Sequence, residues 1–146
     1  MSEQSCLEAL AALLRGVAEF DADDVTICDW RVLDGSSMLA PFAILEPSDE
    51  FSVVWNTSAA EATWNPIVSL IVRFVEWDES KAELYQVRQA IIDALDSGPG
   101  QTLGLAVREI RSDGAIGEIY DRYNQNPEES IPVYLVQRMI IRCEEF

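Results

Sequence analysis

Hydrophobic positions along the chain change their spacing several times, and each change marks a predicted element. Near the N-terminus, apolar residues recur every three or four positions after Ser5-Cys6-Leu7-Glu8, a pattern typical of a capping box. We therefore predict a first helix over about residues 6–19, ended by the acidic run 21–24. A second capping box, residues 80–83, predicts a second helix that continues to Leu95 and stops at the Gly-rich turn 97–100.

Elsewhere, apolar and polar residues alternate at the spacing of β-strands. The strongest pattern covers residues 66–77, where both faces are largely apolar, as in a central strand that is covered on both sides. Residues 58–65 are expected to form a polar loop. The other predicted strands cover residues 25–33, 40–46, 51–57, 105–111, 116–123 and 132–143. Short turns between strands indicate a mainly antiparallel or mixed sheet, so the fold class is α+β, with two helices flanking the sheet in a single domain, residues 1–146.

The charge balance narrows the classes of function. The chain has 26 Asp and Glu against 10 Lys and Arg, which gives a net charge of −16, and it has no histidine. Binding of bare nucleic acid and of anionic membranes is therefore disfavoured, because both need clustered cations. Without histidine, the chain has no Ser-His-Asp or Cys-His machinery and no imidazole ligand for a metal.

No other pattern points to catalysis. Carboxylates cluster at predicted strand ends and loops, where charged residues commonly lie, and no spacing singles out an acid–base pair. Cys6, Cys28 and Cys143 are far apart in the sequence, and we expect them to be reduced and partly buried. We therefore expect neither an enzyme nor a bound metal or cofactor. The N-terminus does not resemble a secretory signal, so we expect a protein of the cytoplasm.

Four residues are candidates for an interface. Most of the four tryptophans are expected in the core, but Trp64 falls in the predicted polar loop and is the one most expected to be exposed. Arg73, Arg138 and Arg142 fall within predicted strands beside many carboxylates, which indicates ion pairs. These pairs could form within one subunit, the simpler alternative, or across a contact between subunits.

Four segments follow one another in a suggestive order: the helix Leu7–Val17, the strand Ile67–Trp77, the helix Leu84–Leu95 and the closing strand Val133–Cys143. This order, over nearly the whole chain, resembles the tail terminator (tail completion) proteins of long-tailed bacteriophages. The resemblance implies a ring, usually a hexamer, in the virion. Such a ring caps the head-proximal end of the tail tube, ends tube polymerisation and joins the tail to the head–tail connector protein. DNA passes through its lumen without specific binding.

An acidic lumen wall would suit this function, because a wall that DNA slides past should not attract phosphate. Two charged turns, Glu46–Glu50 and Asp113–Glu118, are therefore lumen candidates. The carboxylates in question are Glu46, Asp49, Glu50, Asp113 and Glu118. The alternative function is an acidic DNA mimic that inhibits a nucleic-acid-binding protein, although the even spread of acids between apolar strands counts against it.

Overall fold

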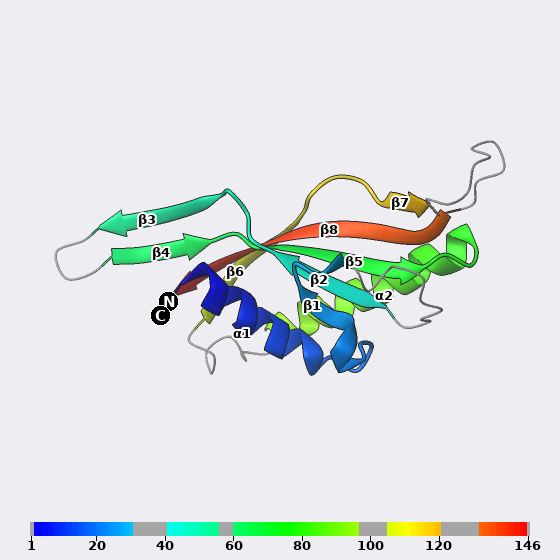
Figure 1. Ribbon diagram of the computed structural model, residues 1–146, viewed down its shortest axis with the longest axis horizontal. Coiled ribbons are helices and arrows are strands. Elements are labelled where there is room, and N and C mark those ends of the chain that lie inside the picture. The colour runs from blue at the N-terminus through cyan, green and yellow to red at the C-terminus, as the bar shows by residue number, and fades with distance from the viewer. Residues whose placement is uncertain (1, 31–40, 56–59, 97–104, 121–131, 146) are drawn as a thin grey trace.

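Residues 2–30, 41–55, 60–96, 105–120 and 132–145 are described by the computed structural model of the chain (Figure 1). These residues form helices α1 (Glu3–Arg15) and α2 (Trp77–Asp96), the short 3-10 helix η1 (Ala22–Asp24) and one sheet of eight strands. The strands are β1 (Val25–Ile27), β2 (Phe42–Glu46), β3 (Phe51–Trp55), β4 (Ala60–Trp64), β5 (Ile67–Arg73), β6 (Leu105–Ser112), β7 (Gly117–Tyr120) and β8 (Pro132–Glu145). The predicted α+β fold class is confirmed.

The sheet is organised around the long strand β8, which pairs with other strands along both of its edges. On one edge, β5 and then β4 follow one another along β8, antiparallel to it. On the other edge, β7 and β6 do the same. Strands β2 and β3 continue this arrangement beyond β5 and β4, and β1 adds to β2 in the parallel direction. Interruptions at residues 47–50 and 65–66 divide this side of the sheet into two halves.

Both helices lie over the inner face of the first half, which contains β2 and β5 (Figure 1). The apolar stripes of α1 and α2 bury Leu10 and Ile91 against alternate β5 residues such as Leu70. The outer face carries a second, smaller cluster in which Phe42 and Tyr134 meet edge to face, with ring centroids 5.9 Å apart. Strand β5 is therefore buried on both faces, as its sequence predicts.

Both helices begin earlier than predicted. Helix α1 is capped by Ser2, whose hydroxyl accepts a hydrogen bond from the Ser5 backbone N–H at 3.1 Å, so Ser5 is not the cap. It ends at Arg15, with Gly16 as its C-cap, rather than at the acidic run 21–24. Within that run, Asp24 is buried in η1. Helix α2 begins at Trp77, three residues before Ser80. Ser80 is buried in its first turn.

The strands also differ from their predicted bounds. The predicted loop 58–65 contains strand β4, in which Ala60, Ala62 and Trp64 share one apolar face. This alternation is short, so the segment resembles a loop in sequence. Strand β1 ends at Ile27 because Cys28 adopts a left-handed backbone with φ of 55°, and the predicted residues 31–33 lie outside the described part of the chain. Strand β5 ends at Arg73, so Trp77 belongs to a helix rather than to a strand.

Candidate functional site

A β-hairpin projects beyond the two helices at one end of the molecule (Figure 1). Its strands β3 and β4 pair with each other along their full length, from Phe51 opposite Trp64 to Trp55 opposite Ala60. Strand β4 reaches β8 only through Thr63 and Trp64. The hairpin therefore stands largely apart from the rest of the sheet, and we call its two strands the arm.

One face of the arm is entirely apolar, and we call it the arm face. The register places its members on the same side of the sheet; they are Phe51, Val53, Trp55, Ala60, Ala62 and Trp64. Trp64 lies opposite the buried Cys143 and packs against the main core, so the arm face continues the inner, helix-covered face of the sheet. Yet Phe51 is 61% exposed and Trp55 is 81% exposed.

This exposure is costly for a monomer. Burying one large apolar side chain contributes about 1.5–3 kcal/mol, and here several lie in water on neighbouring positions. A two-stranded hairpin is also only marginally stable by itself. Contiguous exposed apolar surface of this kind marks a site that contacts another macromolecule. The arm face is therefore the candidate functional site of the chain.

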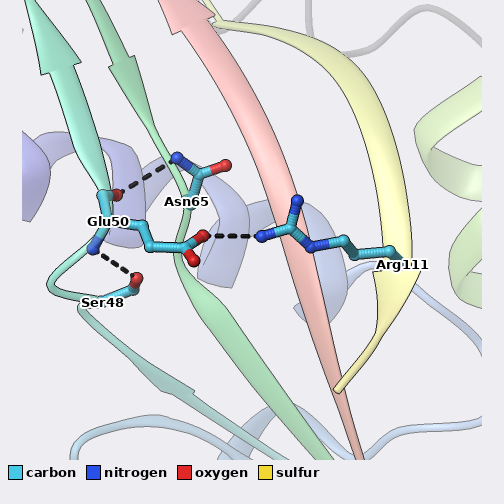
Figure 2. Close-up of polar contacts among 4 residues, drawn as sticks. All are labelled: Ser48, Glu50, Asn65 and Arg111. Atoms are coloured by element: carbon cyan, nitrogen blue, oxygen red, sulfur yellow. Dashed lines mark hydrogen bonds and ion pairs between the residues drawn. The ribbon is translucent and has the colours of Figure 1, made fainter. Parts of the chain in front are cut away.

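The base of the arm is held by polar contacts around Glu50 (Figure 2). Its carboxylate pairs with Arg111 of β6 at 2.6 Å, and its backbone carbonyl accepts a hydrogen bond from the Asn65 side chain at 3.1 Å. Its backbone N–H donates to the Ser48 hydroxyl at 2.9 Å, while the Ser48 N–H donates to Glu3 at the start of α1. These contacts tie the base of the arm to β6 and to the end of the helical layer.

Arg138 and Arg142, two of the predicted interface residues, form ion pairs within the chain. Arg138 lies 3.3 Å from Asp113, and Arg142 lies 3.9 Å from Glu144, which also pairs with Arg108 at 2.9 Å. All of these groups are partly exposed, so each pair contributes only about 0–1 kcal/mol. Arg73 is half-buried at the end of β5.

The structure brings three of the five lumen candidates, Asp49, Glu50 and Asp113, to one region. Glu50 binds Arg111, and Asp113 follows Arg111 by two residues at the end of β6. Glu50 is paired with Arg111 and Asp113 with Arg138, which weakens the repulsion of phosphate by both carboxylates. Asp49 is exposed next to Glu50.

The remaining two lumen candidates accept hydrogen bonds from aromatic side chains. The Trp30 indole N–H donates to Glu46 at 3.1 Å, and the Tyr120 hydroxyl donates to Glu118. The latter bond raises the pKa of Tyr120 because it favours the protonated phenol, and the carboxylate charge adds to the effect. Both carboxylates are therefore engaged by side chains of the same chain.

The expectation that Trp64 is the exposed tryptophan is wrong. Trp64 is half-buried in β4, where its ring centroid lies 5.9 Å from that of Phe51. The exposed residue is Trp55, and Trp30 and Trp77 are also partly exposed, so none of the four tryptophans is a fully buried core residue. The alternation of Phe51, Val53 and Trp55 is the sequence signal that identifies the arm face, but it equally resembles a buried strand.

The three cysteines differ in burial, and the pKa is raised for two of their thiols. Cys6 and Cys143, the two buried thiols, lie close together between α1 and β8. A hydrogen bond that the protonated Cys143 thiol donates to Cys6, together with burial, raises the pKa of Cys143 well above its usual value, so its reactive thiolate is suppressed. The Cys28 side chain reaches solvent, but desolvation of part of it, and then the Glu46 charge, raises the pKa of its thiol as well.

No protein-family model and no curated protein matches this chain. Within the described residues, no group of three or more Cys, Asp or Glu side chains is arranged to hold a metal ion. The same residues include no helix with the length and apolar character needed to span a bilayer. The arm face and the acidic charge are therefore the features from which we infer a function.

Proposed function

We propose that the chain is a structural protein of a bacteriophage tail or neck. In this proposal it forms a ring, most simply a hexamer, on the head-proximal end of the tail tube. The ring ends tube polymerisation and contacts the head–tail connector protein. The observation that carries the proposal is the arm face, because a projecting apolar hairpin needs another protein surface to cover it. The order of elements that resembles the tail terminators supports it.

Charge is compatible with this function. Each subunit carries a net charge of −16, so a ring would present a strongly anionic body to the DNA that passes through it. An anionic wall repels phosphate and lets DNA slide without specific binding. The same charge makes subunits repel one another, and apolar contacts such as those of the arm face must outweigh that repulsion.

A DNA mimic is supported less well. Mimicry of the phosphate backbone needs carboxylates on one continuous face. Here Glu50, Asp113 and Glu144 are each paired with arginine. An exposed apolar hairpin also has no counterpart in DNA. The structure therefore provides no observation that favours the mimic over an assembling protein.

The test is the native mass of the purified chain, measured by light scattering after size exclusion at low and moderate salt. We expect a mass several times the subunit mass of 16.3 kDa, about sixfold for a hexamer, that is favoured as salt screens the repulsion between subunits. Electron microscopy should then show rings with a central opening. A chain that is monomeric at every salt and protein concentration would contradict the proposal.

A further inference from the structure

Two buried thiols meet where the start of α1 lies beside the end of β8 (Figure 1). Cys6 is in the first turn of α1 and Cys143 is near the end of β8, and both are 0% exposed. They belong to the same core cluster, and a hydrogen bond joins their thiols. Their side chains therefore point toward each other, which is the orientation that a disulfide needs. Nearly the whole chain lies between them in the sequence.

The two cysteines differ in how firmly their backbones are held. Cys143 lies in β8 between two paired strands, opposite Trp64 of β4 and Val107 of β6. Its backbone therefore moves only with the sheet. Cys6 is in the terminal turn of a helix, where its N–H donates to the Ser2 carbonyl at 3.0 Å. Helix ends open locally at a lower free energy than central strands, so Cys6 is the thiol that a reagent reaches first.

The thiol pair also adjoins the base of the arm. Cys143 lies opposite Trp64, the last residue of β4. Glu3, one helical turn before Cys6, accepts a hydrogen bond at 3.2 Å from the backbone N–H of Ser48, which precedes β3. A covalent bond between the two sulfur atoms would therefore fix the start of the helical layer to the strand against which the arm is anchored.

We infer that Cys6 and Cys143 form a reversible disulfide, which ties α1 to β8 at the base of the arm, when the folded protein meets a small disulfide such as oxidised glutathione. The inference does not rest on the proposed function. Both residues are free thiols in the structure, as a reducing compartment would keep them. The bond forms when the protein passes to oxidising conditions, and it then holds the two ends of the chain together.

The bond forms by two thiol–disulfide exchanges. When the start of α1 opens, the Cys6 thiolate attacks oxidised glutathione and one glutathione thiolate leaves. When the helix closes, the Cys143 thiol loses its proton to solvent, its sulfur attacks the Cys6 sulfur, and the second glutathione leaves. Two protein thiols are oxidised to one disulfide, and oxidised glutathione is reduced to two molecules of glutathione.

The structure accounts for the rates of the two steps. The first step waits for local opening of α1, so it is slower than the reaction of an exposed thiol and takes minutes to hours. The second step is intramolecular, and the contact between the two thiols gives it a high effective concentration. This contact compensates for the burial that disfavours the Cys143 thiolate.

The experiment uses the full chain in two variants. Cys28→Ser removes the exposed thiol, so any disulfide within this variant joins Cys6 to Cys143. The matched control, Cys28→Ser/Cys6→Ala, keeps Cys143 and removes its partner. Both variants are incubated in the folded state with oxidised glutathione at neutral pH, after circular dichroism has shown that they are folded. Mass spectrometry then gives the intact mass and the linked peptides, and thermal unfolding gives Tm before and after oxidation.

We expect Cys28→Ser to lose the mass of two hydrogen atoms and to give a peptide in which Cys6 is linked to Cys143. Its Tm should rise by about 5–15 °C, because the bond closes a loop of nearly the whole chain in the unfolded state. Dithiothreitol should reverse both changes. The control should neither lose hydrogen nor gain Tm.

Hydrogen exchange at the start of α1 measures how often this turn opens. If the turn has opened many times and the two thiols are still unreacted, or glutathione stays attached to Cys6, the inference is overturned. A disulfide that forms only in denaturant, or one that lowers Tm, would overturn it as well, because either result would mean that the folded backbone cannot accommodate the bond. None of these outcomes changes the native mass, which tests the proposed function separately.

Discussion

Two buried serines should respond in opposite ways to the same substitution. Ser69 lies in the centre of β5 and Ser80 in the first turn of α2, and they are 0% and 1% exposed. The Ser69 hydroxyl has no hydrogen-bond partner among the described residues. The Ser80 hydroxyl accepts from the Val75 backbone N–H at 2.9 Å and lies 3.5 Å from the Arg73 carbonyl.

The magnitudes follow from these environments. An unsatisfied buried hydroxyl costs about 1–3 kcal/mol, and an alanine in its place would lose only the packing of one oxygen atom, so Ser69→Ala should stabilise by about 1 kcal/mol. Ser80→Ala leaves the Val75 N–H without its partner at the junction of β5 and α2, which should cost about 1–2 kcal/mol. For a chain of this size, 1 kcal/mol corresponds to a change in Tm of about 2–4 °C.

The assay is urea unfolding followed by tryptophan fluorescence, with thermal unfolding by circular dichroism as a second measurement. Both variants should keep the wild-type dependence on urea, because neither changes the surface exposed on unfolding. The midpoint should rise for Ser69→Ala and fall for Ser80→Ala. A lower midpoint for Ser69→Ala would refute the reasoning, since it would mean that its hydroxyl stabilises the strand.

Three further predictions concern ionisable groups. A double-mutant cycle on Glu50 and Arg111 should give a coupling energy below about 1 kcal/mol that shrinks with salt, because both side chains are exposed, whereas a larger value would show that the pair is desolvated. Burial, and then the charges of two neighbouring aspartates, raise the pKa of Asp24, so its ionisation destabilises the fold as pH rises above the ordinary value of 3.8. Asp24→Asn should therefore be more stable than wild type at neutral pH and lose this advantage below that value; an advantage of equal size at both pH values would contradict the sign. Ellman's reagent should modify only Cys28 in the folded chain and all three thiols in denaturant, and rapid reaction of the two buried thiols would argue against their burial.

The helices and the central strand could be predicted because their patterns depend on neighbours in the sequence. The apolar spacing from Leu84 to Leu95 identifies α2, and the alternation of Val68, Leu70 and Val72 identifies β5. The start of α1 was missed because two serines that could each cap it lie three residues apart. The one that caps it, Ser2, can only be recognised from where the backbone turns.

The arm could not be predicted because its sequence and its environment disagree. Strand β3 has the alternation of a half-buried strand, yet both of its faces are exposed. Strand β4 has small and polar residues that resemble a loop, but pairing with β3 makes it a strand. Whether an apolar face is covered depends on how far the helices extend over the sheet. That extent is set by the whole fold and cannot be read from the strand's own sequence. For this reason Trp64, which the sequence predicts to be the exposed tryptophan, is half-buried, and Trp55 is exposed.

The ion pairs bear on how an acidic chain can assemble. Arg108, Arg111 and Arg138 lie near the base of the arm and the end of β6, and each is paired with a carboxylate there. These ion pairs lower the electrostatic repulsion between carboxylates at the base of the arm. The arm face itself contains only apolar residues and carries no charge. A neighbouring subunit that covers the arm face would then desolvate aromatic and aliphatic groups rather than carboxylates, which is the less costly way for a chain at −16 to form a large contact.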